Sequence, residues 1–239
     1  MKRAYLDTLL KARAEKKAMA HVTDFATGEE RLVNETGVVD GAALDDEAMK
    51  AVQERLRQDR SGSIETGGGK TLFVRAYNPP LRLIIIGAVH TAQALSPMAK
   101  MAGYDVILID PRSAFATADR FPGVTMMDEW PEPALEKLQP DHRSAVVTLS
   151  HDPKFDEPAI MFALRSPAFY VGALGSRRTH ASRCERLKEA GLSDEEIARI
   201  HGPVGLSIGA LSPTEIAISI LAQMTQVMRQ PTSSQPGAK

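Results

Sequence analysis

Two patterns of apolar positions divide the chain near Asn78-Pro79-Pro80. Before this break, residues 3–17 carry apolar side chains at helical spacing, short strand-like runs follow, and a second helix is expected over Asp45–Arg57. Asp59–Gly69 is rich in Gly, Ser and charged residues, so we expect a flexible connector there. Lys70–Tyr77 is expected to be a strand. This half of the pattern predicts a smaller N-terminal α+β domain.

After the break, apolar runs of strand length alternate with stretches at helical spacing. The run LRLIII from Leu81 is continuously apolar, as is typical of a buried parallel strand. Further strands are expected at Asp105–Asp110, Ser144–Leu149 and Phe169–Leu174, and helices at Ala92–Ala102, Glu157–Arg165, Arg177–Ala190 and Thr214–Arg229. The alternation predicts an α/β domain built on a Rossmann-like, doubly wound parallel sheet. The last helix is apolar on nearly every side, which predicts burial in the core or in a subunit interface.

The expected organisation therefore has three parts. Residues 1–78 form the small N-terminal domain and residues 79–229 the Rossmann-like domain. Residues 230–239 are polar and rich in Pro and Ser, and we expect this tail to be disordered.

Composition narrows the class of protein. The 239 residues carry a net charge of −1, which gives no general attraction to nucleic acid or to anionic membranes. No apolar run approaches the roughly 20 residues of a membrane helix, and the first residues lack the apolar core of a signal peptide. Cys184 is the only cysteine, which excludes an internal disulfide and a Cys-based metal site. We expect a soluble cytoplasmic protein, with Cys184 and Trp130 serving in packing.

The turn after the first expected strand of the larger domain resembles a dinucleotide-binding fingerprint. Gly87, Ala88 and His90 lie between strand and helix, and Asp110 ends the next strand about 20 residues later, where an acidic residue often binds a ribose hydroxyl. Val89 stands where the second fingerprint glycine is expected, and its β-branched side chain should obstruct a pyrophosphate. The alternative is an ordinary tight turn that binds nothing.

Two further segments carry candidate chemistry at strand ends. Ser150, His151 and Asp152 follow the third expected strand, where ligands of open α/β sheets bind. A His beside an Asp could transfer protons. The alternative is a capping turn for the next helix.

Glycines and arginines gather at the fourth strand and beyond. Small residues permit close backbone approach, and a helix start with guanidinium groups favours an anion such as phosphate. The candidate residues are Gly172, Gly175, Ser176, Arg177 and Arg178, and, in a later turn, Gly205 and Gly209. The alternative is a solvated basic helix face, to which we assign the more distant charges Arg183, Arg186 and Lys188.

Together these segments resemble the XdhC/CoxI family, the accessory factors of xanthine dehydrogenase and related molybdenum hydroxylases. The similarity runs from about Pro79 to Met228. It rests on the strand followed by GAVH, the strand ending in Asp110-Pro111-Arg112, and the segments LSHDP, YVGALGSRRTH and GPVGLSIGALSPTEIAISILA.

The resemblance implies a chaperone rather than an enzyme with a catalytic set of its own. Such a protein binds the molybdenum cofactor, as molybdopterin or its dinucleotide form, and delivers it to an apo-molybdenum hydroxylase of the xanthine dehydrogenase type. A cysteine desulfurase would be a second partner and a homodimer the assembly. Arg112 joins the expected cofactor-binding residues through this resemblance. The client enzyme and the form of the cofactor are left open.

The N-terminal part departs from the family pattern. Family members usually carry a GSSPR-like segment and a GGC-(Leu/Val)-Glu segment whose Cys is implicated in holding the cofactor. Here Ala43 stands at the Cys position, and the GSSPR-like segment is missing. Ligation of molybdenum by a thiolate from this position is therefore excluded.

Two other functions remain open at this point. The first is an enzyme that uses NAD(P) or another nucleotide on the same fold; Asp110 would favour NAD, whereas Val89 argues against both dinucleotides. The second is a scaffold that has lost its ligand, which Ala43 and Val89 favour and the intact Arg177 and Arg178 disfavour. No metal-ligand spacing or catalytic triad stands out.

Overall fold

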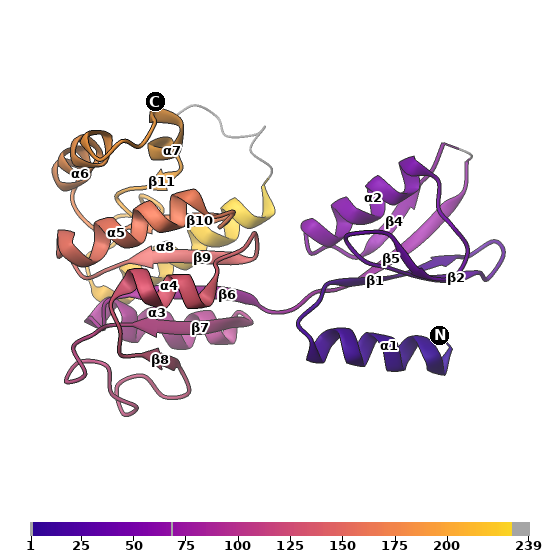
Figure 1. Cartoon of the computed structure of the whole chain (residues 1–239), viewed down its shortest axis with the longest axis horizontal. Helices are drawn as coiled ribbons and strands as arrows, with labels where there is room; N and C mark the ends of the chain where they lie inside the picture. The colour runs from indigo at the N-terminus through magenta and orange to yellow at the C-terminus, as the bar shows by residue number, and fades with distance from the viewer. Residues whose placement is uncertain (1, 68, 231–239) are drawn as a thin grey trace. The chain divides into compact units, whose positions relative to one another are not determined.

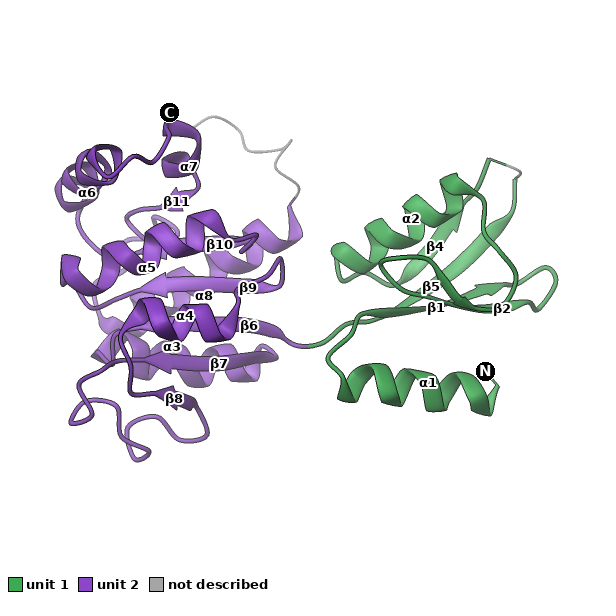
Figure 2. Ribbon diagram, in the orientation of Figure 1, with its two compact units in different colours: residues 1–79 green, residues 80–239 purple. Residues whose placement is uncertain are grey.

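The computed structural model describes residues 2–67 and 69–230. The chain divides into two compact units, residues 1–79 and residues 80–239 (Figure 2). The disordered tail expected at residues 230–239 lies outside the described residues except for Gln230. None of the helices in the described part of the chain has the length and apolar composition that spanning a lipid bilayer requires.

The first unit is an antiparallel sheet with two helices. Its elements are α1 (Arg3–Ala14), β1 (Met19–Asp24), β2 (Glu30–Val33), β3 (Val38–Asp40), α2 (Asp46–Arg57), β4 (Gly62–Glu65) and β5 (Thr71–Tyr77). The strand order is β3-β2-β1-β5-β4. Helix α2 buries Val52 and Leu56 against one set of strand side chains, while α1 packs Tyr5 and Leu9 near Leu32. The expected α+β character is confirmed.

One expectation for this unit is wrong. The stretch Asp59–Gly69 is not a flexible connector throughout, because β4 lies within it and pairs with β5. The strand has only one buried side chain, Ile64, so its apolar pattern is too short to be recognised without its partner strand.

The second unit contains a six-stranded parallel sheet. Its elements are β6 (Leu81–Ile86), α3 (His90–Met101), β7 (Tyr104–Ile109), β8 (Thr125–Met127), α4 (Pro131–Leu138), β9 (Ser144–Thr148), α5 (Pro153–Arg165), β10 (Tyr170–Ala173), α6 (Arg177–Glu189), α7 (Asp194–Ala198), β11 (Ile200–His201) and α8 (Pro213–Arg229). The strand order is β11-β10-β9-β6-β7-β8. Every neighbouring pair is parallel.

Helices cover both faces of this sheet (Figure 1). Alternate residues of β6 face opposite ways: Leu83 and Ile85 pack with α3 and α8, whereas Ile84 and Ile86 pack with α4, α5 and α6. This arrangement explains the continuous apolar run of β6 and confirms the doubly wound, Rossmann-like fold.

Helix α8 is only partly buried within the chain. Its residues Ala217, Ile220 and Met224 are buried against the core, but the side chain of Ile218 is 48% exposed. The apolar composition of α8 predicts that nearly all of its sides are buried. Within the described residues of this chain, the side that carries Ile218 is not buried.

Candidate functional site

The candidate residues lie where five neighbouring parallel strands end. Gly87 follows β6, Asp110 follows β7, Ser150 comes shortly after β9, Gly175 after β10, and the loop containing Gly205 after β11. Since parallel strands end at the same edge, the fold brings these segments together (Figure 1). Ligands of open α/β sheets bind at this edge.

The turn after β6 packs directly against the loop after β9. These two strands are neighbours at the point where the connections change direction across the sheet. Gly87 has a φ of +105°, and a Cβ built there would lie 2.9 Å from the backbone nitrogen of Ser150 and 3.0 Å from its Cα. Glycine is therefore required here both for backbone conformation and for close approach.

Gly87→Ala should lower the free energy of unfolding more than Gly103→Ala does. Gly103 has a similar φ of +88° but no atom within 4 Å of a built Cβ, so it reports the conformational cost alone, about 1–2 kcal/mol. Contact with Ser150 should add about 1 kcal/mol or more at Gly87. Urea denaturation of both variants measures the difference in the free energy of unfolding. Equal losses in the two variants would show that the loops carrying Gly87 and Ser150 can move apart without cost.

The carboxylate of Asp110 is fully engaged by the chain itself. It accepts hydrogen bonds from the N–H of Ala88 at 2.7 Å and from the backbone N–H of Arg112 at 3.0 Å. The guanidinium of Arg112 adds bonds from Nε at 2.9 Å and from Nη2 at 2.8 Å. Both oxygens thus have two donors, and the residue is 2% exposed. The expected contact with a ribose hydroxyl is not supported; Asp110 instead holds the Gly87 turn and orients Arg112.

Burial alone would raise the pKa of Asp110, but the Arg112 guanidinium and the two backbone N–H groups hold this pKa below its ordinary value. A lowered folded-state pKa contributes stability that is complete above the unfolded value of 3.8 and lost as the pH falls through the folded value. Arg112→Ala should raise that pKa, so the stability difference from the unmodified protein should be largest near neutral pH and shrink in acid. Urea denaturation between pH 3 and pH 7 checks this, and a difference independent of pH would contradict it.

The beginning of α3 is open to an anion. Val89 precedes the helix and makes no side-chain capping bond, and the first turn carries no acidic residue. His90, the first helical residue, is exposed. The side chain of Val89 packs partly against the core cluster beneath the helix, which reduces the obstruction expected from it. Free N–H groups at this position favour negative charge.

The segment Ser150-His151-Asp152 has a mainly structural role. The Ser150 hydroxyl donates to Asp156 Oδ1 at 2.7 Å and accepts from the N–H of Asp152 at 3.1 Å. The Asp152 carboxylate caps α5 by accepting from the N–H of Lys154 at 3.0 Å. The capping alternative therefore holds for Asp152. His151 is exposed and has a φ of +63°, so it is the member of this segment that faces solvent.

The beginning of α6 carries two guanidinium groups that the protein leaves free. Ser176 caps the helix by accepting from the N–H of Thr179 at 3.1 Å. Arg177 and Arg178 are exposed in the first turn, which has no acidic residue. Neither makes a hydrogen bond or an ion pair within residues 2–67 and 69–230, so both are available to a ligand.

Gly172 has a packing role instead of the expected ligand contact. It lies within the buried strand β10, hydrogen-bonded on both sides, and a Cβ there would be 2.6 Å from Val204 Cγ2 and 2.7 Å from Tyr170 Cε1. We therefore remove Gly172 from the candidate ligand-binding residues.

Gly205 is also held by the fold. A Cβ at this position would collide with Ser219 Oγ, and its N–H donates to Gln223 Oε1 on α8 at 2.8 Å. Gly209, in the same loop, is exposed with a φ of +77° and open space around it. Of the two glycines, only Gly209 is free to approach a ligand.

A buried ion pair that the sequence did not reveal lies beneath these loops. Arg183 is 3% exposed, which corrects its assignment to a solvated helix face. Its Nη2 donates to the carbonyl of Leu174 at 3.0 Å and lies 4.0 Å from Asp156 Oδ2. Burial raises the pKa of Asp156, partly offset by Ser150 and Arg183. The pair joins α5 and α6 to the loops after β9 and β10.

Cys184 packs among apolar residues between α6 and the sheet, as expected. Its Sγ lies 3.5 Å from Nε2 of His180. Burial raises the pKa of this thiol, which keeps it protonated near neutral pH and therefore a weak nucleophile. Within residues 2–67 and 69–230, no three His, Cys, Asp or Glu side chains are grouped as metal ligands.

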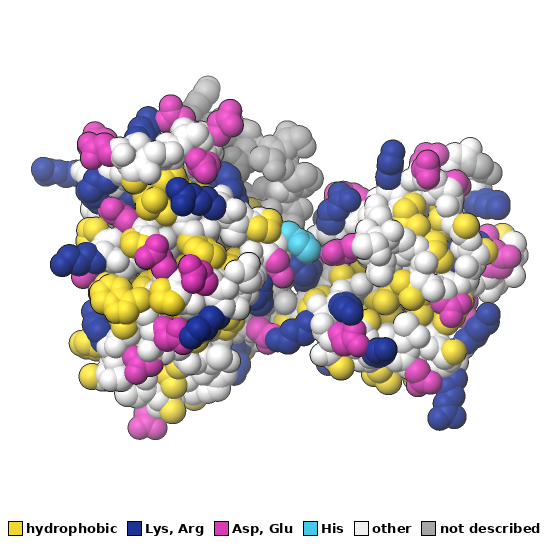
Figure 3. Space-filling view, in the orientation of Figure 1, with side chains coloured by type: hydrophobic (Ala, Val, Ile, Leu, Met, Phe, Trp, Pro, Cys, Tyr) yellow, Lys and Arg dark blue, Asp and Glu magenta, His cyan; other side chains and the backbone are white. Residues whose placement is uncertain are grey.

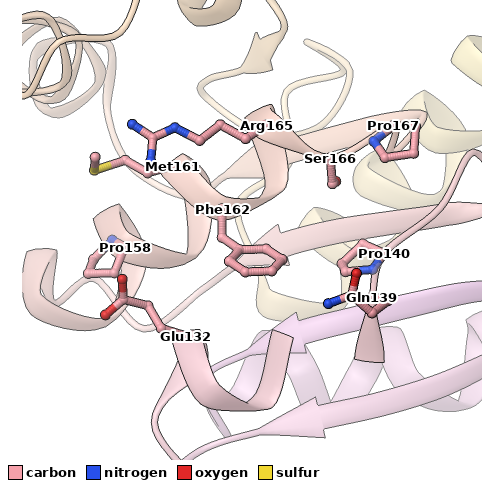
Figure 4. Close-up of a pocket in the computed structure, with 9 residues that line it drawn as sticks. All are labelled: Glu132, Gln139, Pro140, Pro158, Met161, Phe162, Arg165, Ser166 and Pro167. Carbon is pink, nitrogen blue, oxygen red and sulfur yellow. The ribbon is translucent and has the colours of Figure 1, made fainter. Parts of the chain in front are cut away.

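A pocket of about 390 Å³ lies elsewhere, between α4 and α5 and the loops that follow them (Figure 4). Phe162 points into it, and Glu132 and Arg165 lie at its rim. Both loops lead into the amino ends of strands, so this pocket lies at the edge of the sheet opposite to the edge that carries the candidate residues.

Comparison with known proteins identifies the family. The model of the XdhC Rossmann domain matches residues 83–224, which is more than half of the chain. The chain belongs to the XdhC family. Every segment placed at the carboxyl edge of the sheet falls within the matched range.

Characterised and uncharacterised relatives share this similarity. The molybdenum cofactor insertion chaperone PaoD of Escherichia coli is 34% identical over 68% of this chain and 45% of its own length. The uncharacterised protein YqeB of the same organism is 32% identical over 80% of this chain and 37% of its own. A probable xanthine dehydrogenase subunit of Bacillus subtilis is 32% identical over 66% of this chain and 46% of its own. The chain thus spans less than half the length of these relatives.

A solved structure shares the fold of both units. The crystal structure of a protein described as a xanthine dehydrogenase from Bacillus halodurans matches with a TM-score of 0.74 and 27% identity. The match covers 95% of this chain and 67% of the solved chain.

Proposed function

We propose that this chain is a molybdenum cofactor-binding chaperone that helps to insert the cofactor into a molybdenum hydroxylase of the xanthine dehydrogenase type. The observation that carries the proposal is the pair of free guanidinium groups, Arg177 and Arg178, at the start of α6 in an XdhC Rossmann domain. The cofactor carries a phosphate, which such a site binds. The similarity to PaoD supports the same function.

The residues present fit such a ligand. The uncapped start of α3 and the basic start of α6 face the edge where ligands bind, and the nearby carboxylates of Asp110 and Asp152 are used in internal hydrogen bonds. Arg177 and Arg178 would hold the phosphate, and His90, His151 and Gly209 would contact the rest of the molecule. When bound, the cofactor supplies the redox chemistry of molybdenum to the client; this chain binds, orients and shields it.

The proposal does not require a thiolate from the chain. Ala43, at the position of the family cysteine, is exposed in the loop between β3 and α2. Cys184 is the only thiol, and its pKa is raised. Sulfuration of the cofactor would therefore depend on a partner such as a cysteine desulfurase.

A homodimer is part of the proposal. The large apolar side chains of Ile208, Leu211 and Ile218 are 56%, 89% and 48% exposed on and before the first turns of α8. Exposed apolar groups that are near one another in the sequence favour an interface between two copies of the chain. Light scattering of the purified chain tests this assembly.

The nucleotide-dependent enzyme is the weaker alternative. Its main support was Asp110 as a ligand for ribose, but both carboxylate oxygens are saturated by donors of the chain. Breaking the Arg112 pair to bind a ribose would leave a buried charge without its partner.

Transfer to a client enzyme tests the proposed function. The chain is loaded with molybdenum cofactor, separated from excess, and mixed with an apo-molybdenum hydroxylase. We expect faster recovery of hydroxylase activity than with the same amount of free cofactor. Recovery at the same rate as with free cofactor would contradict the chaperone role.

A further inference from the structure

Three aromatic rings and a guanidinium form a continuous row at the carboxyl edge of the sheet. The guanidinium carbon of Arg112 lies 4.9 Å from the ring centre of Phe115 and 5.5 Å from that of Phe155. The ring of Phe155 stacks in turn on Trp130, with centres 4.8 Å apart and planes 17° from parallel. We call these four residues the aromatic row.

The aromatic row is accessible. Phe115 is 48% exposed and Trp130 is 55% exposed. Trp130 packs on Phe155, as expected of it, but more than half of its surface stays open to solvent. Figure 3 shows hydrophobic side chains on the surface near the beginnings of α4 and α5. Contiguous exposed aromatic groups often mark a binding surface. Because the residues come from the loop after β7, the N-cap of α4 and the first turn of α5, the sequence gives no local pattern for the row.

The protein holds the charged member of the row in a fixed plane. Two parallel bonds from Nε and Nη2 of Arg112 to the oxygens of Asp110 form a fork. A guanidinium fixed in this way presents a flat cationic face, which stacks on aromatic rings. The buried carboxylate of Asp110 thus links the row to the Gly87 turn, since it also accepts from Ala88.

We propose that the aromatic row stacks a planar nitrogen heterocycle, the ring end of the ligand whose phosphate lies at α6. This inference rests on the proposed function. Neighbouring strands lie about 4.8 Å apart, so the ends of β7 and β10, three intervals apart in the sheet order, are separated by roughly 14 Å. A ligand that reaches both is extended. The dinucleotide form of the cofactor fits this requirement, with a ring at each end and a pyrophosphate between them.

The single tryptophan makes the stacking measurable. Trp130 is the only Trp in the chain, so fluorescence excited at a wavelength that tryptophan absorbs and the four tyrosines do not reports on the row alone. The full chain is titrated with GMP and with CMP, and with ribose 5-phosphate as a control that has the phosphate but no ring. We expect saturable quenching by at least one nucleotide and none by ribose 5-phosphate. Quenching by ribose 5-phosphate equal to that by the nucleotides would overturn the proposal. So would the absence of quenching by any probe together with unchanged cofactor affinity in the variants below.

Variants separate stacking from general effects. Phe155→Leu and, on the exposed loop, Phe115→Ala should each weaken ring binding by about tenfold. Phe25→Leu is the control, because Phe25 is 67% exposed and stacks on Phe73 in the other unit. Should Phe155→Leu fail to fold, Phe115→Ala decides. Unchanged affinity for the ring-bearing ligands in a folded variant would refute the proposal.

The same variants show whether the stacked ring is the pterin or the nucleobase. They also separate failure of the stacking proposal from failure of the proposed chaperone function. Dialysis against molybdopterin lacking a nucleotide shows whether the pterin uses the row. If Phe115→Ala weakens the binding of molybdopterin, the stacked ring is the pterin. If Phe115→Ala weakens only the binding of GMP or CMP, the stacked ring is the nucleobase. Either sensitivity supports stacking. Nucleotide quenching in a chain that binds no cofactor would refute the chaperone function while the row stands. Cofactor binding that is insensitive to both variants, without nucleotide quenching, would refute the row alone.

Discussion

Replacement of both Arg177 and Arg178 by Ala should weaken cofactor binding by a hundredfold or more. Each arginine is exposed at the start of α6 and has no partner within the described ranges, so removing it costs the folded protein little. A hydrogen bond to a charged group contributes about 1.5–3 kcal/mol, and two such bonds correspond to at least two factors of ten in the dissociation constant. Equilibrium dialysis of molybdenum cofactor against both proteins measures the loss.

A double variant elsewhere controls for net charge. Arg3→Ala with Arg13→Ala removes the same charge from exposed positions on α1. Its affinity should stay within about twofold of the unmodified chain, since exposed charges at a distance are screened by salt. If the Arg177/Arg178 variant binds as tightly as this control, the phosphate is bound elsewhere.

Arg183→Ala should destabilise the larger unit by about 3–5 kcal/mol, because it leaves the buried carboxylate of Asp156 without its cation. In the described structure, Asp156 Oδ2 and Arg183 Nη1 already lack hydrogen-bond partners. Once Arg183 is replaced, few contacts therefore remain to stabilise the carboxylate of Asp156. The loss should extend to the loops after β9 and β10, since Arg183 also bonds the carbonyl of Leu174. Urea denaturation measures the free energy of unfolding.

Arg186→Ala is the matched control on the same helix. Arg186 pairs with Glu157, but its side chain is 43% exposed, and such surface pairs contribute about 0–1 kcal/mol. A loss below about 1 kcal/mol in Arg183→Ala, similar to that of the control, would show that the buried carboxylate is accommodated in another way.

Features with a local cause were predictable from the sequence. The run LRLIII is buried on both faces as β6, and the capping boxes at Ser193 and Ser212 form with Glu196 and Glu215 at the starts of α7 and α8. The candidate segments lie at strand ends because parallel strands of a doubly wound sheet end at one edge.

Features that depend on tertiary contacts were not predictable. Arg183 lies on the same helix as the exposed arginines of α6, and its position over Asp156 makes it buried. Gly172 resembled a ligand-binding glycine because the segment around it is rich in small residues, but Tyr170 and Val204 fill the space beside it. Trp130 is placed by its stack on Phe155, a contact between the N-cap of α4 and the first turn of α5.

Binding of the molybdenum cofactor to the purified apo chain tests the central claim most directly. Equilibrium dialysis is performed with the cofactor, with NAD and with ATP in parallel, at one salt concentration. We expect saturable binding of the cofactor, and much weaker binding of NAD and ATP. Tight binding of NAD or ATP without binding of the cofactor would contradict the chaperone function and assign the site at the carboxyl edge of the sheet to nucleotide chemistry.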